Sequence, residues 1–134
     1  MKKLFLFLIS FCILFSACGN DSGNNTNGGD KAMYEQISAE EAKKIMDSND
    51  DIIILDVREQ DEFDAGHIPG AVLLPYTEID EKAQVLFPDK DKQMLVYCRS
   101  GRRSKIAAEA LAKIGYTNIK EFGGIIDWPY EVVK

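Results

Sequence analysis

One cysteine of this chain stands in a setting that favours nucleophilic chemistry. Cys98 follows the mostly apolar residues 94–97 and precedes the run RSGRR at 99–103, after which apolar residues recur with helical spacing. This order places Cys98 between a strand and the N-terminus of a helix, where free backbone N–H groups favour an anion. Such a setting lowers the pKa of a thiol from about 8.5 into the range of about 3.5 to 7.5. We therefore predict that Cys98 is a nucleophile that needs no general base.

Arginines gather around this cysteine. Three of the four arginines, against twelve lysines, follow Cys98 within five residues, and the fourth follows a predicted strand at 52–56. That strand is expected to end at the same edge of the sheet. A planar, permanently charged guanidinium suits a tetrahedral oxyanion. The candidate substrate-binding residues are therefore Arg58, Arg99, Ser100, Gly101, Arg102 and Arg103. The alternative is that the arginines only pair with the abundant carboxylates.

The rest of the chain alternates between strand and helix patterns. Strands are predicted at 34–37, 52–56, 71–74, 94–98 and 118–122, and helices at 38–47, 59–65, 79–86 and 103–114. Ser38 and Glu41 form a capping box at the start of the first helix, and Gly115 is a plausible C-cap of the last. This alternation predicts an α/β fold with a largely parallel sheet, in which ligands bind beyond the carboxyl ends of the strands.

Length and composition limit the possible classes of protein. A chain of 134 residues, of which 46% are hydrophobic, has room for one domain with a real core. The formal net charge of −6 argues against a nucleic-acid partner. The arginine cluster is therefore a local positive island on an acidic protein.

The N-terminus is typical of an exported bacterial protein. Lys2 and Lys3 precede an uncharged run at 4–15, which is too short to span a bilayer but suits a signal peptide. This run ends in LFSACG at 14–19, which resembles the lipobox of bacterial lipoproteins. We expect residues 1–17 to be removed, Cys18 to be acylated, and the protein to be anchored to the bacterial cell membrane by its N-terminal lipid. Ordinary signal cleavage after Gly19 is the alternative.

Processing of this kind leaves Cys98 in an unusual position. Removal of residues 1–17 takes away Cys12 and changes the net charge from −6 to −8. With Cys18 lipidated, Cys98 is the sole free thiol in a compartment where thiols are normally oxidised. Residues 18–32 are predicted to be a lipidated N-terminus and flexible tether, because residues 20–30 contain no apolar side chain. The folded domain is predicted at 33–134.

Three stretches of the chain resemble the single-domain rhodaneses, which are thiosulfate sulfurtransferase-like proteins. They are DVREQDEFDAGHIPGA at 56–71, YCRSGRRS at 97–104 and GGIIDW at 123–128. The resemblance implies an α/β domain with a mostly parallel five-stranded sheet, helices on both faces, and a catalytic cysteine in a six-residue loop at 98–103. It also implies an enzyme that moves sulfane sulfur from thiosulfate, or a similar anionic donor, to cyanide or a thiol. The sulfur travels as a persulfide of Cys98, and no cofactor is expected.

Two other functions share these features. Cysteine-dependent phosphatases and arsenate reductases also hold a cysteine in a loop before a helix, but they need an arginine six positions after the cysteine. In this chain the sixth position is Ser104 and the arginine stands at Arg103, so the loop is smaller. The other alternative is a membrane-tethered sulfur carrier or binding module with little turnover, which would use the same cysteine.

The sole histidine and two carboxylates have simpler interpretations. A protein zinc site needs about three or four ligands, and His67 lacks such partners in the sequence, so no metal site is expected. The resemblance places His67 in a turn of structural use. Asp56 and Glu62 are expected to be partners for arginine and backbone groups rather than a catalytic pair.

Overall fold

The computed structural model describes residues 33–134. The predicted signal peptide, the predicted lipidation site Cys18 and the predicted tether lie outside the described residues. Within residues 33–134, no helix is both long enough and apolar enough to cross a membrane.

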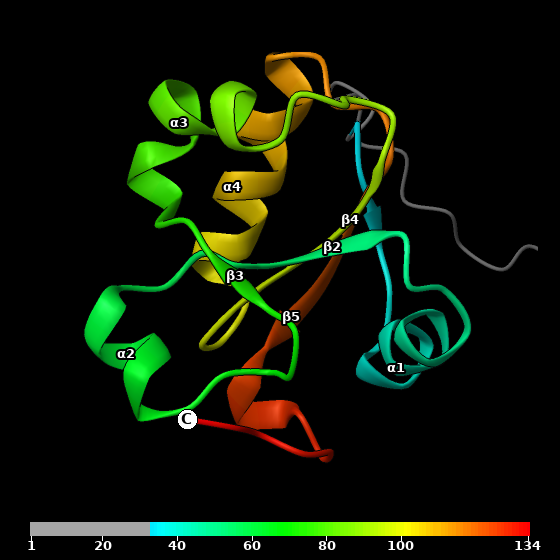
Figure 1. The fold of residues 1–134 in the computed structure, drawn as a ribbon, viewed down its shortest axis with the longest axis vertical. Coiled ribbons are helices and arrows are strands. Elements are labelled where there is room, and N and C mark those ends of the chain that lie inside the picture. Colours follow the sequence, from blue (N-terminus) through cyan, green and yellow to red (C-terminus); the bar gives the residue numbers. More distant parts are fainter. Residues whose placement is uncertain (1–32) are drawn as a thin grey trace, which may run out of the picture. The chain divides into compact units, whose positions relative to one another are not determined.

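A five-stranded sheet forms the centre of the domain (Figure 1). Its strands are β1 (Glu35–Gln36), β2 (Ile52–Asp56), β3 (Val72–Leu73), β4 (Gln93–Cys98) and β5 (Ile119–Gly124). Their order in the sheet is β1-β5-β4-β2-β3, and every neighbouring pair is parallel. The predicted α/β class is confirmed, and the sheet is wholly rather than mostly parallel.

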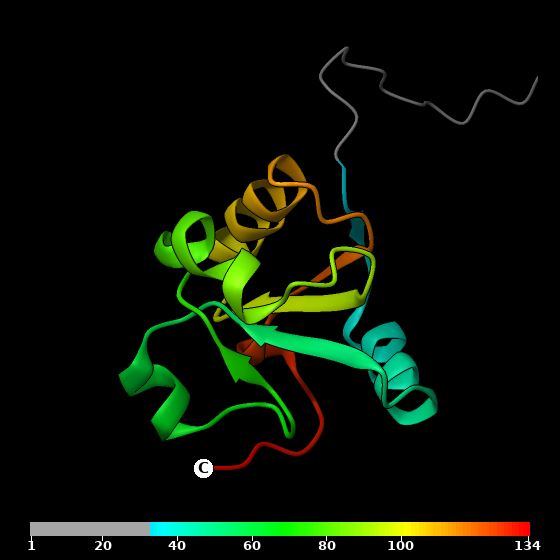
Figure 2. The same ribbon diagram turned by 45° about the horizontal axis from the view of Figure 1, so that its top comes forward.

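Helices cover both faces of this sheet. They are α1 (Ala39–Ser48), α2 (Gln60–Ala65), α3 (Ile79–Leu86) and α4 (Arg102–Lys113), with short 3₁₀ turns at Tyr76–Glu78 and Ile125–Asp127. Helices α3 and α4 lie together on one face and α1 lies on the other, as both views of the ribbon show (Figures 1 and 2). The predicted helices are confirmed, with boundaries that differ by one or two residues.

Alternation along β4 divides the core into two halves. Met94, Val96 and Cys98 face α3 and α4, whereas Leu95 and Tyr97 pack with residues of α1 and of the C-terminal segment. All five side chains are buried. A central parallel strand that is buried on both faces explains why its sequence is almost continuously apolar.

Two helix termini behave as their sequences predict. The Ser38 hydroxyl accepts the backbone N–H of Glu41 at 3.1 Å, and the Glu41 carboxylate accepts that of Ser38 at 2.8 Å, which completes the capping box. At the end of α4, Gly115 has a φ of 102°. The N–H of Tyr116 donates to the carbonyl of Leu111 at 3.1 Å, and this Schellman turn sends the chain back toward β5.

Candidate active site

The segment between β4 and α4 folds around the sulfur of Cys98. Strand β4 ends at Cys98 and α4 begins at Arg102, so only three residues make the turn. Gly101 adopts a φ of 107°, a left-handed conformation that suits glycine. Its backbone N–H donates to Cys98 Sγ at 3.0 Å. The sulfur therefore lies at the N-terminus of α4, where the sequence predicted it.

Ser104 completes this setting from the first turn of α4. Its side chain is fully buried, and its Oγ lies 3.4 Å from Cys98 Sγ. The same oxygen lies 2.6 Å from Oε1 of Glu121, a carboxylate on β5 that is only 3% exposed. It is also 3.0 Å from the carbonyl oxygen of Gly101 and 3.3 Å from that of Gly123. Ser104 thus connects the cysteine to a buried acid.

Hydrogen bonds from the loop favour the thiolate of Cys98. Burial by itself raises the pKa of this thiol, because a charge is less stable away from water. The Ser104 hydroxyl and the backbone N–H groups of Ser104, Gly101 and Ser100 outweigh burial and lower the pKa below its ordinary value. The pKa of Cys98 is therefore lowered, as expected, but the main causes are hydrogen bonds from Ser104, Gly101 and Ser100 rather than arginine charges.

The end of strand β5 packs directly against the backbone of the loop. A side chain at Gly124 would place its Cβ 1.9 Å from the carbonyl oxygen of Arg99, so only glycine lets the loop backbone lie this close. The N–H of Ile126 donates to the same oxygen at 3.2 Å. The pairing of β4 with β5 shifts in register between Val96 and Cys98, at the level where the loop begins. The GG pair at 123–124 therefore fixes the position of the loop.

The three arginines after Cys98 have different surroundings. Arg103 donates to both carboxylate oxygens of Glu62, at 2.7 and 2.8 Å. Arg99 and Arg102 are exposed, and neither forms an ion pair or a side-chain hydrogen bond within the described part of the chain. Two permanent positive charges are thus available beside the loop, whereas the third is occupied.

Arg58 does not join this group. Its guanidinium is 5% exposed, and it donates to the carboxylate of Asp56 and, at 2.7 Å, to the carbonyl of Gly66. The phenol of Tyr97 donates to the same carboxylate at 2.7 Å. The side chain of Tyr97 lies on the face of β4 opposite to Cys98. The structure therefore gives Arg58 a buried partner instead of the predicted place among the substrate-binding residues.

His67 has the structural surroundings that its turn position implied. Its Nδ1 lies 2.9 Å from the carbonyl oxygen of Phe63, and its ring stacks on that of Phe63 with centroids 3.8 Å apart. Its backbone exchanges two hydrogen bonds with Val133, at 2.8 and 2.9 Å. Asp56 and Glu62 are also partners of arginine and backbone, as expected.

Sequence reasoning missed the role of Glu121. The pattern at 118–122 predicts a last strand without placing Glu121 on either face of the sheet. Ile119 and Glu121 are two residues apart, so they point to the same face of the sheet, and both are buried. The alternation with Ile119 was the signal that this carboxylate faces the core. Ser104 entered only as the residue at the sixth position after the cysteine.

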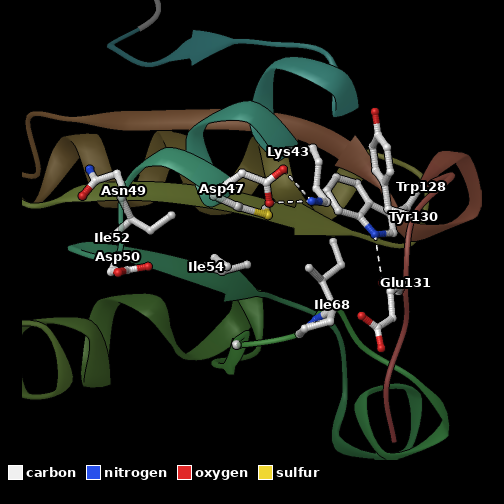
Figure 3. Close-up of a pocket in the computed structure, with 13 residues that line it drawn as sticks. Lys43, Asp47, Asn49, Asp50, Ile52, Ile54, Ile68, Trp128, Tyr130 and Glu131 are labelled. Carbon is white, nitrogen blue, oxygen red and sulfur yellow. Dashed lines mark hydrogen bonds and ion pairs between the residues drawn. The ribbon is translucent and has the colours of Figure 1, made fainter.

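A cavity of about 410 Å³ lies on the face of the sheet opposite to Cys98 (Figure 3). Ile54, Ile68 and Trp128 contribute to its apolar walls, and Lys43 and Asp47 of α1 form an ion pair at its rim. None of its lining residues belongs to the loop at 98–103. The cavity is therefore separate from the cysteine, and no sequence pattern indicated it.

Comparisons with known proteins agree with this geometry. The family model of the rhodanese-like domain matches residues 38–129. The putative sulfur carrier protein YrkF of Bacillus subtilis is 35% identical over 79% of this chain, which spans 57% of that protein. The thiosulfate sulfurtransferase PspE of Escherichia coli is 36% identical over 60% of this chain and 77% of its own length.

A solved structure shows the same likeness. A rhodanese with anions from Escherichia coli superposes with a TM-score of 0.58 at 35% identity, covering 61% of this chain and 96% of that one. The chain belongs to the rhodanese-like domain family.

Proposed function

We propose that this protein is a sulfurtransferase that carries sulfane sulfur as a persulfide of Cys98. The observation that carries the proposal is the closure of the loop on a single sulfur atom. Gly101 donates to Cys98 Sγ at 3.0 Å, and the hydroxyl of Ser104 lies 3.4 Å away. The names of the relatives, a thiosulfate sulfurtransferase and a putative sulfur carrier, support the same chemistry.

The first half of the reaction loads the cysteine. The thiolate of Cys98 attacks the outer sulfur of thiosulfate, a new S–S bond forms, and the original S–S bond breaks. Sulfite leaves with the electron pair of that bond, so charge and electrons balance and no base is needed. The loop N–H groups that favour the thiolate then stabilise the persulfide anion.

The second half of the reaction removes the outer sulfur from Cys98. A thiolate or cyanide attacks the outer sulfur of the persulfide, and Cys98 leaves as a thiolate. The product is a new persulfide or thiocyanate, and the enzyme returns to its starting state. In such a ping-pong cycle Cys98 is the nucleophile of the first half and the leaving group of the second.

The anionic donor binds to the arginine side chains beside the loop that are unpaired within residues 33–134. Arg99 and Arg102 are exposed without partners among the described side chains, and the backbone of Ser100 and Gly101 lines the same turn. A sulfonate suits these donors because guanidinium groups bind tetrahedral oxyanions with planar, charged hydrogen bonds. Arg103 contributes by helping to fix the position of the loop, since its ion pair with Glu62 holds it in place.

The shape of the loop disfavours phosphatase chemistry. A phosphatase needs an arginine at the sixth position, and here Ser104 fills that position with its hydroxyl beside Glu121. Arg103, one residue earlier, turns to Glu62 rather than over the loop. The sulfur-carrier alternative shares the persulfide and differs only in turnover, so thiosulfate-dependent production of sulfite over many cycles separates the two.

Intact mass after incubation with thiosulfate tests the proposal. We expect a gain of one sulfur atom, located on the peptide that contains Cys98 and removed by cyanide. Cys98→Ser should keep the fold, because serine is close to cysteine in size, and should gain no sulfur. A folded wild-type chain that gains no sulfur would contradict the proposed function.

The N-terminal predictions also remain proposals. Signal cleavage before Cys18, acylation of Cys18 and membrane anchorage through the tether at 18–32 rest on the sequence motif. Mature protein should partition with membranes, and Cys18→Ala should abolish acylation. Wild-type protein that is wholly soluble and unacylated would favour ordinary cleavage after Gly19.

A further inference from the structure

A buried carboxylate lies behind the reactive cysteine, one hydroxyl group away. Glu121 is 3% exposed and Cys98 is 1% exposed, and Ser104 between them is fully buried. Ser104 Oγ lies 2.6 Å from Glu121 Oε1 and 3.4 Å from Cys98 Sγ. These three groups form a continuous polar path inside the core, and the two-step sulfur transfer leaves Glu121 without a role.

The hydroxyl between them has only one proton. While Glu121 is ionised, this proton points to the carboxylate, because hydrogen bonds to charged acceptors are the stronger ones. The carbonyl oxygens of Gly101 and Gly123 are also near, but they are neutral and lie farther away, at 3.0 and 3.3 Å. Ser104 can then only accept a hydrogen bond from a Cys98 thiol. When Glu121 is protonated, it donates to Ser104, and the Ser104 proton is free to point to a Cys98 thiolate.

Two negative charges at this place would be poorly compensated. Two anions at one buried site are disfavoured, because they repel each other at short distance and both lose contact with water. The backbone N–H groups of Gly101, Ser100 and Ser104 serve the cysteine, whereas the carboxylate accepts one backbone N–H, that of Gly123 at 2.8 Å. Within residues 33–134, no ion pair joins Glu121 to a basic side chain.

The neighbouring titratable groups do not supply the missing charge. Arg103 on α4 interacts with the charge of Cys98, but its strongest partner is Glu62 of α2. On the side of β1, Tyr34 lies near Glu121 and near Glu109 of α4. Burial and then these carboxylates raise the pKa of its phenol, so it is neutral at physiological pH.

We propose that Cys98 and Glu121 share one proton through Ser104. The S–H bond of Cys98 breaks as an O–H bond forms on Ser104, and the former Ser104 proton moves to Glu121 Oε1. The three groups together keep one negative charge throughout. Glu121 is then a positioning residue, which holds the proton while Cys98 is a thiolate. This inference rests on the proposed function, in which Cys98 is the nucleophile.

Two substitutions should move the reactivity of Cys98 in opposite directions. Glu121→Gln removes the competing negative charge, and its amide oxygen can still accept from Ser104 and Gly123, which both contact Oε1 of the glutamate. The thiolate of Cys98 should therefore form at lower pH. Ser104→Ala removes the hydroxyl that donates to the thiolate, so the thiolate should form at higher pH.

Alkylation by iodoacetamide measures the thiolate directly. The rate is followed against pH in the full chain, by the mass of the peptide that contains Cys98. Below the midpoint of the profile, we expect Glu121→Gln to react about three to ten times faster than wild type and Ser104→Ala to react more slowly. In a Ser104→Ala background, Glu121→Gln should have a smaller effect. Glu109→Gln, which removes an exposed carboxylate from α4, is the matched control and should leave the profile unchanged.

Slower or unchanged alkylation of Glu121→Gln would overturn the inference. If Glu121 only supported the loop, its loss would slow alkylation in Glu121→Gln, as the loss of the hydroxyl does in Ser104→Ala. If Glu121→Gln does not fold, the wild-type profile decides. A shared proton gives two ionisations that belong to the pair, whereas a single ionisation contradicts it. Alkylation needs no sulfur donor. Failure of the proposed function would therefore appear as no sulfur gain from thiosulfate, independently of these pH profiles.

Discussion

Arg103 and Glu62 form a two-point ion pair that ties α4 to α2. Both terminal nitrogens of Arg103 donate to the carboxylate, at 2.7 and 2.8 Å, and the carboxylate also accepts the backbone N–H of Glu59 at 3.0 Å. The hydrogen bond from Arg103 is the main reason that the pKa of Glu62 falls to about 2. The helix that carries the loop is thus fixed to the segment that follows β2.

This pair should make the fold sensitive to acid. The pKa of Glu62 in the folded chain lies below its ordinary value of 4.5, so the stabilisation is complete above about pH 4.5 and is lost as the pH falls toward 2. We expect Glu62→Gln to lower the free energy of unfolding by about 1–2 kcal/mol at pH 7, with the difference shrinking below pH 4.5. Urea unfolding across this pH range measures it. Asp61→Asn, an exposed neighbour on α2, is the control, and equal losses for both variants would contradict the prediction.

The free arginines should govern the handling of thiosulfate. Arg102→Ala should raise the KM for thiosulfate by about three- to tenfold at low ionic strength, and added salt should shrink the difference, because the charge is exposed. Lys105→Ala removes an exposed charge one turn farther along α4 and should change KM little. Steady-state kinetics with thiosulfate at two salt concentrations test this. Equal effects of the two substitutions would mean that only net charge matters.

Gly124 should tolerate no side chain. A Cβ at this position would lie 1.9 Å from the carbonyl oxygen of Arg99, so Gly124→Ala must displace the loop backbone. We expect this variant to lose nearly all persulfide formation, measured as sulfur gain per folded molecule. Gly115→Ala is the control, because its φ of 102° strains alanine far from the loop. It should cost about 1 kcal/mol of stability and keep its activity. A Gly124→Ala variant with normal sulfur gain would contradict the proposed support of the loop by β5.

Arg58 should matter for stability rather than for substrate binding. Arg58→Met leaves the fully buried carboxylate of Asp56 without its positive partner, which destabilises a fold by about 3–5 kcal/mol. The surface pair of Lys92 with Asp51 is the matched comparison, and Lys92→Met should cost at most about 1 kcal/mol. Unfolding by urea gives both values. If folded Arg58→Met instead shows an increased KM for thiosulfate and unchanged stability, the role first predicted from the sequence is correct.

The loop should discriminate between sulfur and phosphorus chemistry. We expect negligible hydrolysis of aryl phosphates by the wild-type chain under conditions in which thiosulfate loads Cys98. The reason is that hydrogen-bond donors act only about 2.7 to 3.1 Å from the developing anion, and this loop closes on a single atom. Efficient aryl-phosphate hydrolysis that disappears in Cys98→Ser would overturn the sulfurtransferase proposal.

The backbone of this site could be predicted from local patterns. The apolar run before Cys98, the helical spacing after it and the capping box at Ser38 are signals within a few residues, and each element lies where its pattern placed it. The shift of the pKa of Cys98 could also be predicted in direction, since it follows from the place of the cysteine at a helix N-terminus.

The partners of the side chains could not be predicted in the same way. Arg58 and Arg103 look alike in the sequence to Arg99 and Arg102, and the difference arises from Asp56 and Glu62, which the fold brings to them. The contacts of Ser104 with Glu121 and of Arg99 with Gly124 join α4 or its loop to β5 across 17 and 25 residues. Such pairings depend on the register of β5 against β4, which no local pattern specifies.

The contact of Gly124 with the loop makes the reactivity of Cys98 depend on the pairing of β5 with β4. Until β5 pairs with β4, nothing fixes Ser100 and Gly101 so that their N–H groups meet the sulfur. An unfolded chain therefore carries an ordinary thiol, largely protonated at neutral pH. The pKa of the Cys98 thiol therefore falls only when the chain folds, so the population of its thiolate at neutral pH depends on the tertiary structure.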